Sequence, residues 1–312
     1  MTVLNVADRL PRQIPRDICT RDETVSKLAE IVDSQSTVHV RGTPASGKSI
    51  LSLLLRDYYR RHGRTVFLLN TWEMLHNVDD PWMDFARLIR RYNPNVKKNS
   101  DIFAPTNVII IDEAQATYKD NRFWNRIVKD IWGGVGYPIK LCLFCSYGSP
   151  SKGIPYDNKG TYTPARFSPN QRVSLTPSFA FDTPQIGLFY GKDEYEEVVT
   201  RFCSSQFVEK YTISGDARNY IFSLTNGHPG AVTSIMTYLF KVRTMNMRYR
   251  HLHHFDSYVS SMAGATVGML DCFQPSDKEG RLDKQIGLLC LVQLTPVFRN
   301  TALRSNIELF PR

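Results

Sequence analysis

The feature that most constrains this chain is an eight-residue segment, GTPASGKS, at residues 42–49. It matches the pattern G-x-x-x-x-G-K-[ST] in full and lies between a predicted strand and a predicted helix, as phosphate binding by this pattern requires. Glycines at both ends allow backbone N–H groups to turn inward around phosphate oxygens, and the following helix directs its positive end at the same anion. The segment therefore predicts a loop that binds the phosphates of a nucleotide.

The residue types in this segment have separate predicted roles. Lys48 is expected to reach the β- and γ-phosphates as a catalytic residue, and the Ser49 hydroxyl to complete the coordination of Mg²⁺. The expected cofactors are therefore ATP and Mg²⁺; guanine specificity is not expected, because no N-K-x-D follows the fourth strand. The predicted nucleotide-binding residues here are Gly42, Thr43, Pro44, Ala45, Ser46, Gly47, Lys48, Ser49 and Ile50.

A second segment, NVIIIDEAQ, places two carboxylates at the end of an apolar run. The run, residues 107–112, is typical of a strand covered on both faces. Asp112 lies at its carboxyl end, where we expect it to bind Mg²⁺ together with Ser49. Glu113 is expected to orient and polarise the attacking water, with a solvated strand-end charge as the alternative. The pair predicts hydrolysis rather than phosphate transfer to a small molecule.

Strands alternate with helices along the first 180 residues, which predicts an α/β fold with a doubly wound parallel sheet of the P-loop NTPase type. From residue 190 the strands give way to helical patterns, which predicts a helical lid domain. Strands are expected at 37–41, 65–70, 107–112, 139–146 and 171–176. The expected domains are an N-terminal segment with a leading helix (1–36), the NTPase core (37–180), the lid (181–250) and a partial C-terminal module (251–312).

Two shorter patterns make local predictions. Thr20 followed by Glu23 matches a capping box, so a helix is expected to start near Arg21. Cys142 and Cys145 form a C-x-x-C pair inside the apolar run IKLCLFC, and no second pair or His follows at zinc-finger spacing. They are therefore predicted to be buried thiols rather than metal ligands.

GTPASGKS and IIIDEAQ, with an extra strand between them, resemble the P-loop ATPases of the additional-strand, catalytic-glutamate division, which includes the AAA+ and STAND families. In that division the strand between the two motifs in space ends in a polar sensor, and LCLFCS has Ser146 there. The resemblance implies that Ser146 senses the γ-phosphate or positions water; a capped strand end is the alternative. TNGHPGAV is similar to the G-x-P turn of STAND ATPases, which implies that Pro229 lies against the nucleotide; a plain helix–helix turn is the alternative.

Over about residues 12–245 the chain resembles the ATPase region of fungal Crinkler-type proteins, with RDE, GTPASGKS, IIIDEAQ, LFYGKDEYEEVV and TNGHPGAV in that order. Such proteins join the ATPase to a ubiquitin-like header and a nuclease-like domain, which we do not recognise in this sequence. The family implies a secreted effector. The N-terminal residues, with acids and prolines where a signal peptide is apolar, instead predict an intracellular protein, cytoplasmic or nuclear, and no apolar run approaches the ~20 residues of a membrane span.

The chain carries 39 Lys and Arg against 30 Asp and Glu, a net charge of +9. Residues 51–100 contribute nine basic residues against five acids, and residues 201–250 contribute seven against two. The basic segments 87–98 and 241–254 are therefore candidates for contact with nucleic acid, with a solvated surface as the alternative for each.

Two functions fit these features. The first is a nucleotide-driven switch or assembly ATPase, which predicts self-association, lid closure and an arginine finger from Arg122, Arg126 or Arg166. The alternative is a nucleic-acid-handling ATPase of loader or initiator type, favoured by the basic segments and by the likeness of DEAQ to the DEAD/DEAH boxes. A protein that binds nucleotide without hydrolysis is disfavoured, because all four residues expected to bind Mg²⁺–ATP and activate water are intact.

Overall fold

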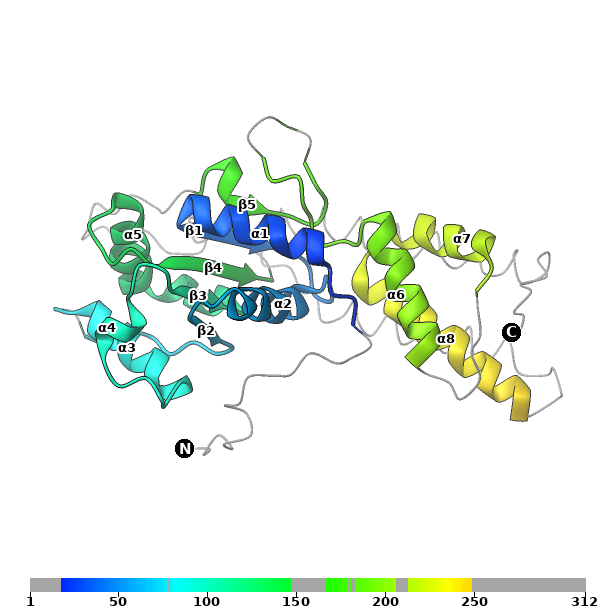
Figure 1. The fold of residues 1–312 in the computed structure, drawn as a ribbon, viewed down its shortest axis with the longest axis horizontal. Helices are drawn as coiled ribbons and strands as arrows, with labels where there is room; N and C mark the ends of the chain where they lie inside the picture. The colour runs from blue at the N-terminus through cyan, green and yellow to red at the C-terminus, as the bar shows by residue number, and fades with distance from the viewer. Residues whose placement is uncertain are drawn as a thin grey trace. The chain divides into compact units, whose positions relative to one another are not determined.

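The computed structural model describes residues 18–77, 79–146, 167–178, 180, 183–205 and 213–248 (Figure 1). The chain divides into two compact units, the first ending at Tyr190 and the second beginning at Gly191. The expected module at 251–312 lies outside the described residues. Among the described helices, none combines the length and the apolar character needed to cross a membrane.

A five-stranded, all-parallel sheet forms the centre of the first unit (Figure 1). Its strands are β1 (Thr37–Arg41), β2 (Val66–Leu69), β3 (Val108–Ile111), β4 (Lys140–Cys145) and β5 (Arg172–Val173), in the order β2-β3-β4-β1-β5. β4 therefore lies between β1, which precedes GTPASGKS, and β3, which precedes the two carboxylates. Because all strands run in one direction, their carboxyl ends meet at one edge of the sheet.

The two faces of the sheet bear two separate apolar cores, because successive strand residues point to opposite sides. One face is covered by α1 (Asp22–Gln35) and α2 (Lys48–Arg61), and this core includes Leu28, Leu55 and Ile110. Helices on each face make the fold doubly wound, and this confirms the predicted α/β architecture of the P-loop NTPase type.

The opposite face is covered by α3 (Pro81–Tyr92), α4 (Asn99–Ile102), a π-helical segment (Phe123–Val128) and α5 (Lys129–Gly133). In α3, the spacing of Trp82, Phe85, Leu88 and Ile89 predicts one buried face. Phe85, Leu88 and Ile89 are buried, and Trp82 packs partly buried against the same core. Asp80 caps this helix by accepting a 3.0 Å hydrogen bond from the Met83 N–H.

The predicted capping box at the start of α1 is wrong. The Thr20 hydroxyl donates to the Asp22 carboxylate at 3.0 Å, and the Glu23 carboxylate accepts from Lys27, one turn along the helix, at 2.6 Å. Arg21 occupies the N-cap in a left-handed conformation with φ 49°, and no side chain caps the helix. The leading helix still begins next to Arg21, so its position is as expected although its cap is not.

The first unit ends with a segment that runs back to α1. The predicted strand at 171–176 is shorter than expected: β5 has two residues, followed by a parallel bridge between Ser174 and Gly187. The buried Arg21 guanidinium donates to the carbonyls of Gly187, Leu188 and Phe189 at 3.0–3.3 Å. A charged side chain with three backbone acceptors thus fastens this segment to the start of α1.

The described part of the second unit is helical, with α6 (Lys192–Ser205), α7 (Gly215–Thr225) and α8 (Pro229–Arg248). Asn226 and Gly227, with φ of 48° and 74°, end α7, and the N–H of Ala231 in the first turn of α8 donates to His228 Nδ1 at 3.2 Å. Left-handed residues close one helix and proline opens the next, so the predicted helix–helix turn is present.

Candidate functional site

The loop between β1 and α2 requires its two glycines for different reasons. A Cβ on Gly42 would lie 2.3 Å from Leu188 Cδ1 and 2.5 Å from Ser46 Oγ, so this position has no room for a side chain. Gly47 has φ 87° at the N-cap of α2, a conformation that glycine adopts at no steric cost. The chain can therefore pass from strand to helix within six residues.

Hydrogen bonds inside the loop hold it in a closed turn. The buried Ser46 donates to the Thr43 carbonyl from its hydroxyl at 2.7 Å and from its N–H at 3.3 Å. Pro44 and Ala45 are exposed, and Ala45 has a positive φ of 60°. Ile50, half-buried in the first turn of α2, packs against the core beneath α1 and α2. The exposed residues thus lie at the tip of the loop and the apolar one faces the core.

Lys48 lies within the loop, with only 5% of the residue exposed. Its ammonium donates to the carbonyls of Gly42 at 3.2 Å and Thr43 at 2.7 Å. Burial lowers the pKa of Lys48, and the negative charges of Glu113 and Asp112 oppose that shift. A phosphate at this position would favour the charged ammonium more strongly than neutral carbonyls do.

Ser49 and Asp112 meet at the carboxyl edge of the sheet. The Asp112 N–H donates to the Leu69 carbonyl at 2.8 Å, which extends the β2–β3 ladder by one residue. Burial raises the pKa of Asp112, and a hydrogen bond with the Ser49 side chain opposes this shift. A carboxylate and a hydroxyl are ligands that Mg²⁺ accepts when phosphates and water complete its octahedron, so the two residues fit this ion. The described residues contain no cluster of three His, Cys, Asp or Glu that would bind a metal alone.

Glu113 and Ser146, from adjacent strands, contact each other directly. The Ser146 hydroxyl donates to Glu113 Oε2 at 3.1 Å. Gln115 joins them, because its side-chain amide donates to the same Oε2 while its Oε1 accepts from the Ser146 N–H at 3.0 Å. Gln115 is the residue that the sequence reasoning missed; its only signal was a polar side chain two residues after Glu113.

A second group that the sequence did not predict surrounds the buried His39 on β1. His39 Nε2 lies 3.0 Å from Cys145 Sγ and 3.3 Å from the Tyr118 hydroxyl, and its ring stacks on Phe167. Burial, with the nearby charges of Arg41 and Arg172, lowers the pKa of His39 to about 3. This imidazole is therefore neutral at physiological pH and supports β1 and β4 from within the core.

The C-x-x-C pair does not form a joint site. Cys142 belongs to the core beneath α1 and α2, whereas Cys145 belongs to the opposite core. Both thiols are fully buried, and burial raises the pKa of each. The prediction of buried thiols is confirmed.

The remaining predicted site residues come from several different parts of the chain. Pro229 is the first residue of α8, in the second unit. Arg122 donates to the Leu75 carbonyl at 2.7 Å, whereas Arg126 is exposed. Arg166 is outside the described residues, as are the side chains of segment 241–254.

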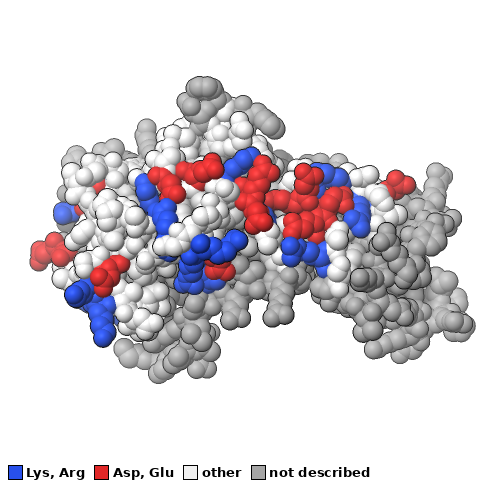
Figure 2. Space-filling view, in the orientation of Figure 1, with Lys and Arg blue, Asp and Glu red and all other residues white. Residues whose placement is uncertain are grey.

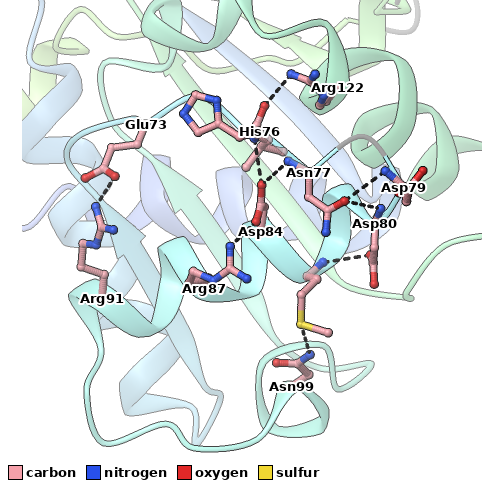
Figure 3. A network of polar contacts seen from close by, with 12 residues as sticks. Glu73, His76, Asn77, Asp79, Asp80, Asp84, Arg87, Arg91, Asn99 and Arg122 are labelled. Atoms are coloured by element: carbon pink, nitrogen blue, oxygen red, sulfur yellow. Dashed lines mark hydrogen bonds and ion pairs between the residues drawn. The ribbon is translucent and has the colours of Figure 1, made fainter.

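The basic segment 87–98 is partly neutralised by acids (Figure 3). Arg87 pairs with Asp84, which also accepts the His76 and Asn77 N–H groups, and Arg91 pairs with Glu73. On the face shown in Figure 2, basic and acidic side chains of the described residues are interspersed and form no continuous basic surface. The excess of Lys and Arg in the sequence therefore does not produce a basic surface on the described part of this face.

No protein-family model matches the sequence, and no curated protein matches it. Among solved structures, the Walker-type ATPase PABY2304 of Pyrococcus abyssi is similar, with 12% sequence identity. The match covers 90% of this chain and 92% of that chain, with a TM-score of 0.45. The likeness is distant, so the site is assigned from the residues themselves.

Proposed function

We propose that this protein binds and hydrolyses ATP in a Mg²⁺-dependent reaction and works as a nucleotide-driven switch or assembly ATPase. One observation carries the proposal. Lys48 and Ser49 follow β1, Asp112 and Glu113 follow β3, and Ser146 follows β4, and their contacts join them at one edge of the sheet. Phosphate binding, metal binding and water activation all require residues at this edge.

In the proposed reaction, Lys48 exchanges its two loop carbonyls for phosphate oxygens, while the loop N–H groups and the start of α2 bind the same anion. Ser49 and Asp112 hold Mg²⁺, which when bound neutralises phosphate charge. The Glu113 carboxylate accepts the proton of the attacking water, and Ser146 binds the γ-phosphate or orients that water.

The helical unit supplies the proposed lid. Its described helices and the proline turn at the start of α8 support the predicted helical lid (181–250), with Pro229 against the nucleotide. The order β3-β4-β1, with a polar residue after β4, supports the proposed relationship to the AAA+ and STAND ATPases, including the Crinkler-type region. The proposal includes two further points: the protein self-associates, and it acts inside the cell.

Glu113→Gln tests the proposed reaction most directly. The amide cannot accept the proton, so ATP binding should stay within twofold of the native protein while hydrolysis falls at least 100-fold. Fluorescent-nucleotide titration and phosphate release measure the two quantities. Glu30→Gln, an exposed glutamate on α1, is the matched control and should leave both unchanged. Unchanged turnover in Glu113→Gln would remove the assignment.

The alternative, a nucleic-acid-handling ATPase, has less support. It depends on segments 87–98 and 241–254, and in the first of these Arg87 and Arg91 are already paired with acids. Lys97 and Lys98 are exposed. Stimulation of the ATPase by DNA, with salt-dependent binding, would favour this alternative.

A further inference from the structure

Gln115 connects the end of β3 to the end of β4 through its side chain. Its amide N–H donates to Glu113 Oε2, and its carbonyl oxygen accepts from the Ser146 N–H at 3.0 Å. The Ser146 hydroxyl donates to that same Oε2 at 3.1 Å. Three residues that follow the ends of two neighbouring strands thus form one closed polar network around a single carboxylate oxygen.

The two carboxylate oxygens of Glu113 differ in their hydrogen bonds. Both donors contact Oε2, and among the described residues no hydrogen bond reaches Oε1. An exposed glutamate otherwise samples several rotamers, so two donors on one oxygen fix the plane of the carboxylate. The backbone of Glu113 is left-handed, with φ 55° and ψ 38°, and it immediately precedes a 3₁₀ helix (Ala114–Lys119) that contains Gln115.

We propose that Gln115 is a positioning residue for ATP hydrolysis. It holds Glu113 Oε2, together with Ser146, so that Oε1 stays available to accept the proton of the attacking water. The inference rests on the proposed function. A base that is correctly oriented contributes about 10²–10⁴-fold to a rate, and the loss of its orientation removes part of that factor.

A purely structural role makes a different prediction. If Gln115 only linked β3 and β4, its removal would alter stability or ATP affinity and would act whether or not Glu113 could accept a proton. A residue that acts through Glu113 affects kcat, leaves KM nearly unchanged, and has no further effect once Glu113 is an amide.

The experiment compares Gln115→Ala and Gln115→Glu with the native chain in steady-state ATP hydrolysis. Gln115→Glu keeps an acceptor for the Ser146 N–H but loses the donor to Glu113, so it should lower kcat about as much as Gln115→Ala does. We expect about a tenfold loss in kcat for each, with KM and the Kd for ATP within twofold. Gln35→Glu is the control: Gln35 lies at the end of α1 and, among the described residues, its side chain bonds to Ser34 alone, so this change should have no effect.

The decisive comparison is made in the Glu113→Gln background, where adding Gln115→Ala should change the residual rate by less than twofold. An unchanged kcat in both single variants, or an equal further loss in the double variant, would overturn the inference. Thermal unfolding of each variant identifies any that misfold. If the alanine variant misfolds, the test depends on Gln115→Glu, whose side chain has nearly the same shape as the native one. A native protein that binds ATP without hydrolysing it would instead overturn the proposed function.

Discussion

Single residues of the P-loop meet separate physical requirements. Gly42 is needed for space, because Leu188 and Ser46 occupy the position of its missing Cβ, whereas Gly47 is needed for its left-handed backbone. Ala45 also has a positive φ, which is strained for a residue with a Cβ. A sequence pattern that writes both glycines alike does not distinguish these requirements.

Gly42→Ala should disrupt the loop. The added methyl group must displace Leu188 or Ser46, which we expect to cost about 1–3 kcal/mol of stability and to weaken ATP binding at least tenfold. Urea unfolding and nucleotide titration measure the two effects. Gly133→Ala is the matched control, because its Cβ would meet only Val135, at an ordinary 3.7 Å. Equal behaviour of the two variants would contradict the steric explanation.

His39 should make the stability of the first unit depend on pH. Its pKa is about 3 in the folded state, against 6.5 for an unperturbed histidine, so the folded protein resists protonation that the unfolded chain accepts. Its contribution is complete above pH 6.5 and is lost as the pH falls towards 3, at up to about 1.4 kcal/mol per pH unit. His39→Gln should therefore show a smaller loss between pH 7 and 5 in urea unfolding. Parallel curves for the two proteins would count against this role.

At the scale of elements, strand and helix positions follow from local pattern, whereas contacts between elements do not. The strands at β1, β3 and β4 lie where apolar runs predict them, because a buried parallel strand must be apolar on both faces. The start of α1 differs: Arg21, whose partners are 166–168 residues away, replaces the predicted local cap. At this helix start, hydrogen bonds from Arg21 to carbonyls distant in sequence form instead of the local capping motif.

Arg21→Met should destabilise the first unit, because the segment at 187–189 loses its donors while its carbonyls stay in place. We expect a loss of about 2–4 kcal/mol in the free energy of unfolding. The capping-box prediction would make Glu23→Ala harmful. We expect it to leave the urea midpoint unchanged, since among the described residues the Glu23 side chain bonds Lys27 alone, on the surface. A larger loss of stability in Glu23→Ala than in Arg21→Met would instead support the capping box.

In the whole molecule, the site residues that are described (Lys48, Ser49, Asp112, Glu113 and Ser146) all belong to the first unit. A switch must change its shape or its partners with the bound nucleotide, and an arginine from a second copy would complete the charge at the γ-phosphate. The surface charge shown in Figure 2 is mixed in sign, which suits contact between proteins at least as well as contact with nucleic acid.

Light scattering with Mg²⁺ and ATP should therefore show a higher mass for Glu113→Gln, which retains ATP, than for the nucleotide-free protein. Duplex or single-stranded DNA at low salt should change the native ATPase rate by less than twofold. The double variant Lys97→Glu, Lys98→Glu is the control for the exposed positive charges, and its ATPase rate with and without DNA should match that of the native chain. A large stimulation by DNA that this double variant abolishes would favour the nucleic-acid alternative.

Several parts of this protein could be predicted from the amino-acid sequence, because they depend on neighbouring residues: the phosphate loop, the apolar strands, the paired carboxylates and the proline turn. Their conformations depend on glycine freedom, helix polarity and burial pattern, which operate over a few residues. The place of β4 between β1 and β3, with Ser146 at its end, was expected from the family resemblance. Only the folded chain brought Gln115 to Glu113 and Ser146, and joined Arg21 to 187–189. These contacts join residues distant in sequence, and the choice among acceptors is made by the packed fold rather than by any local preference.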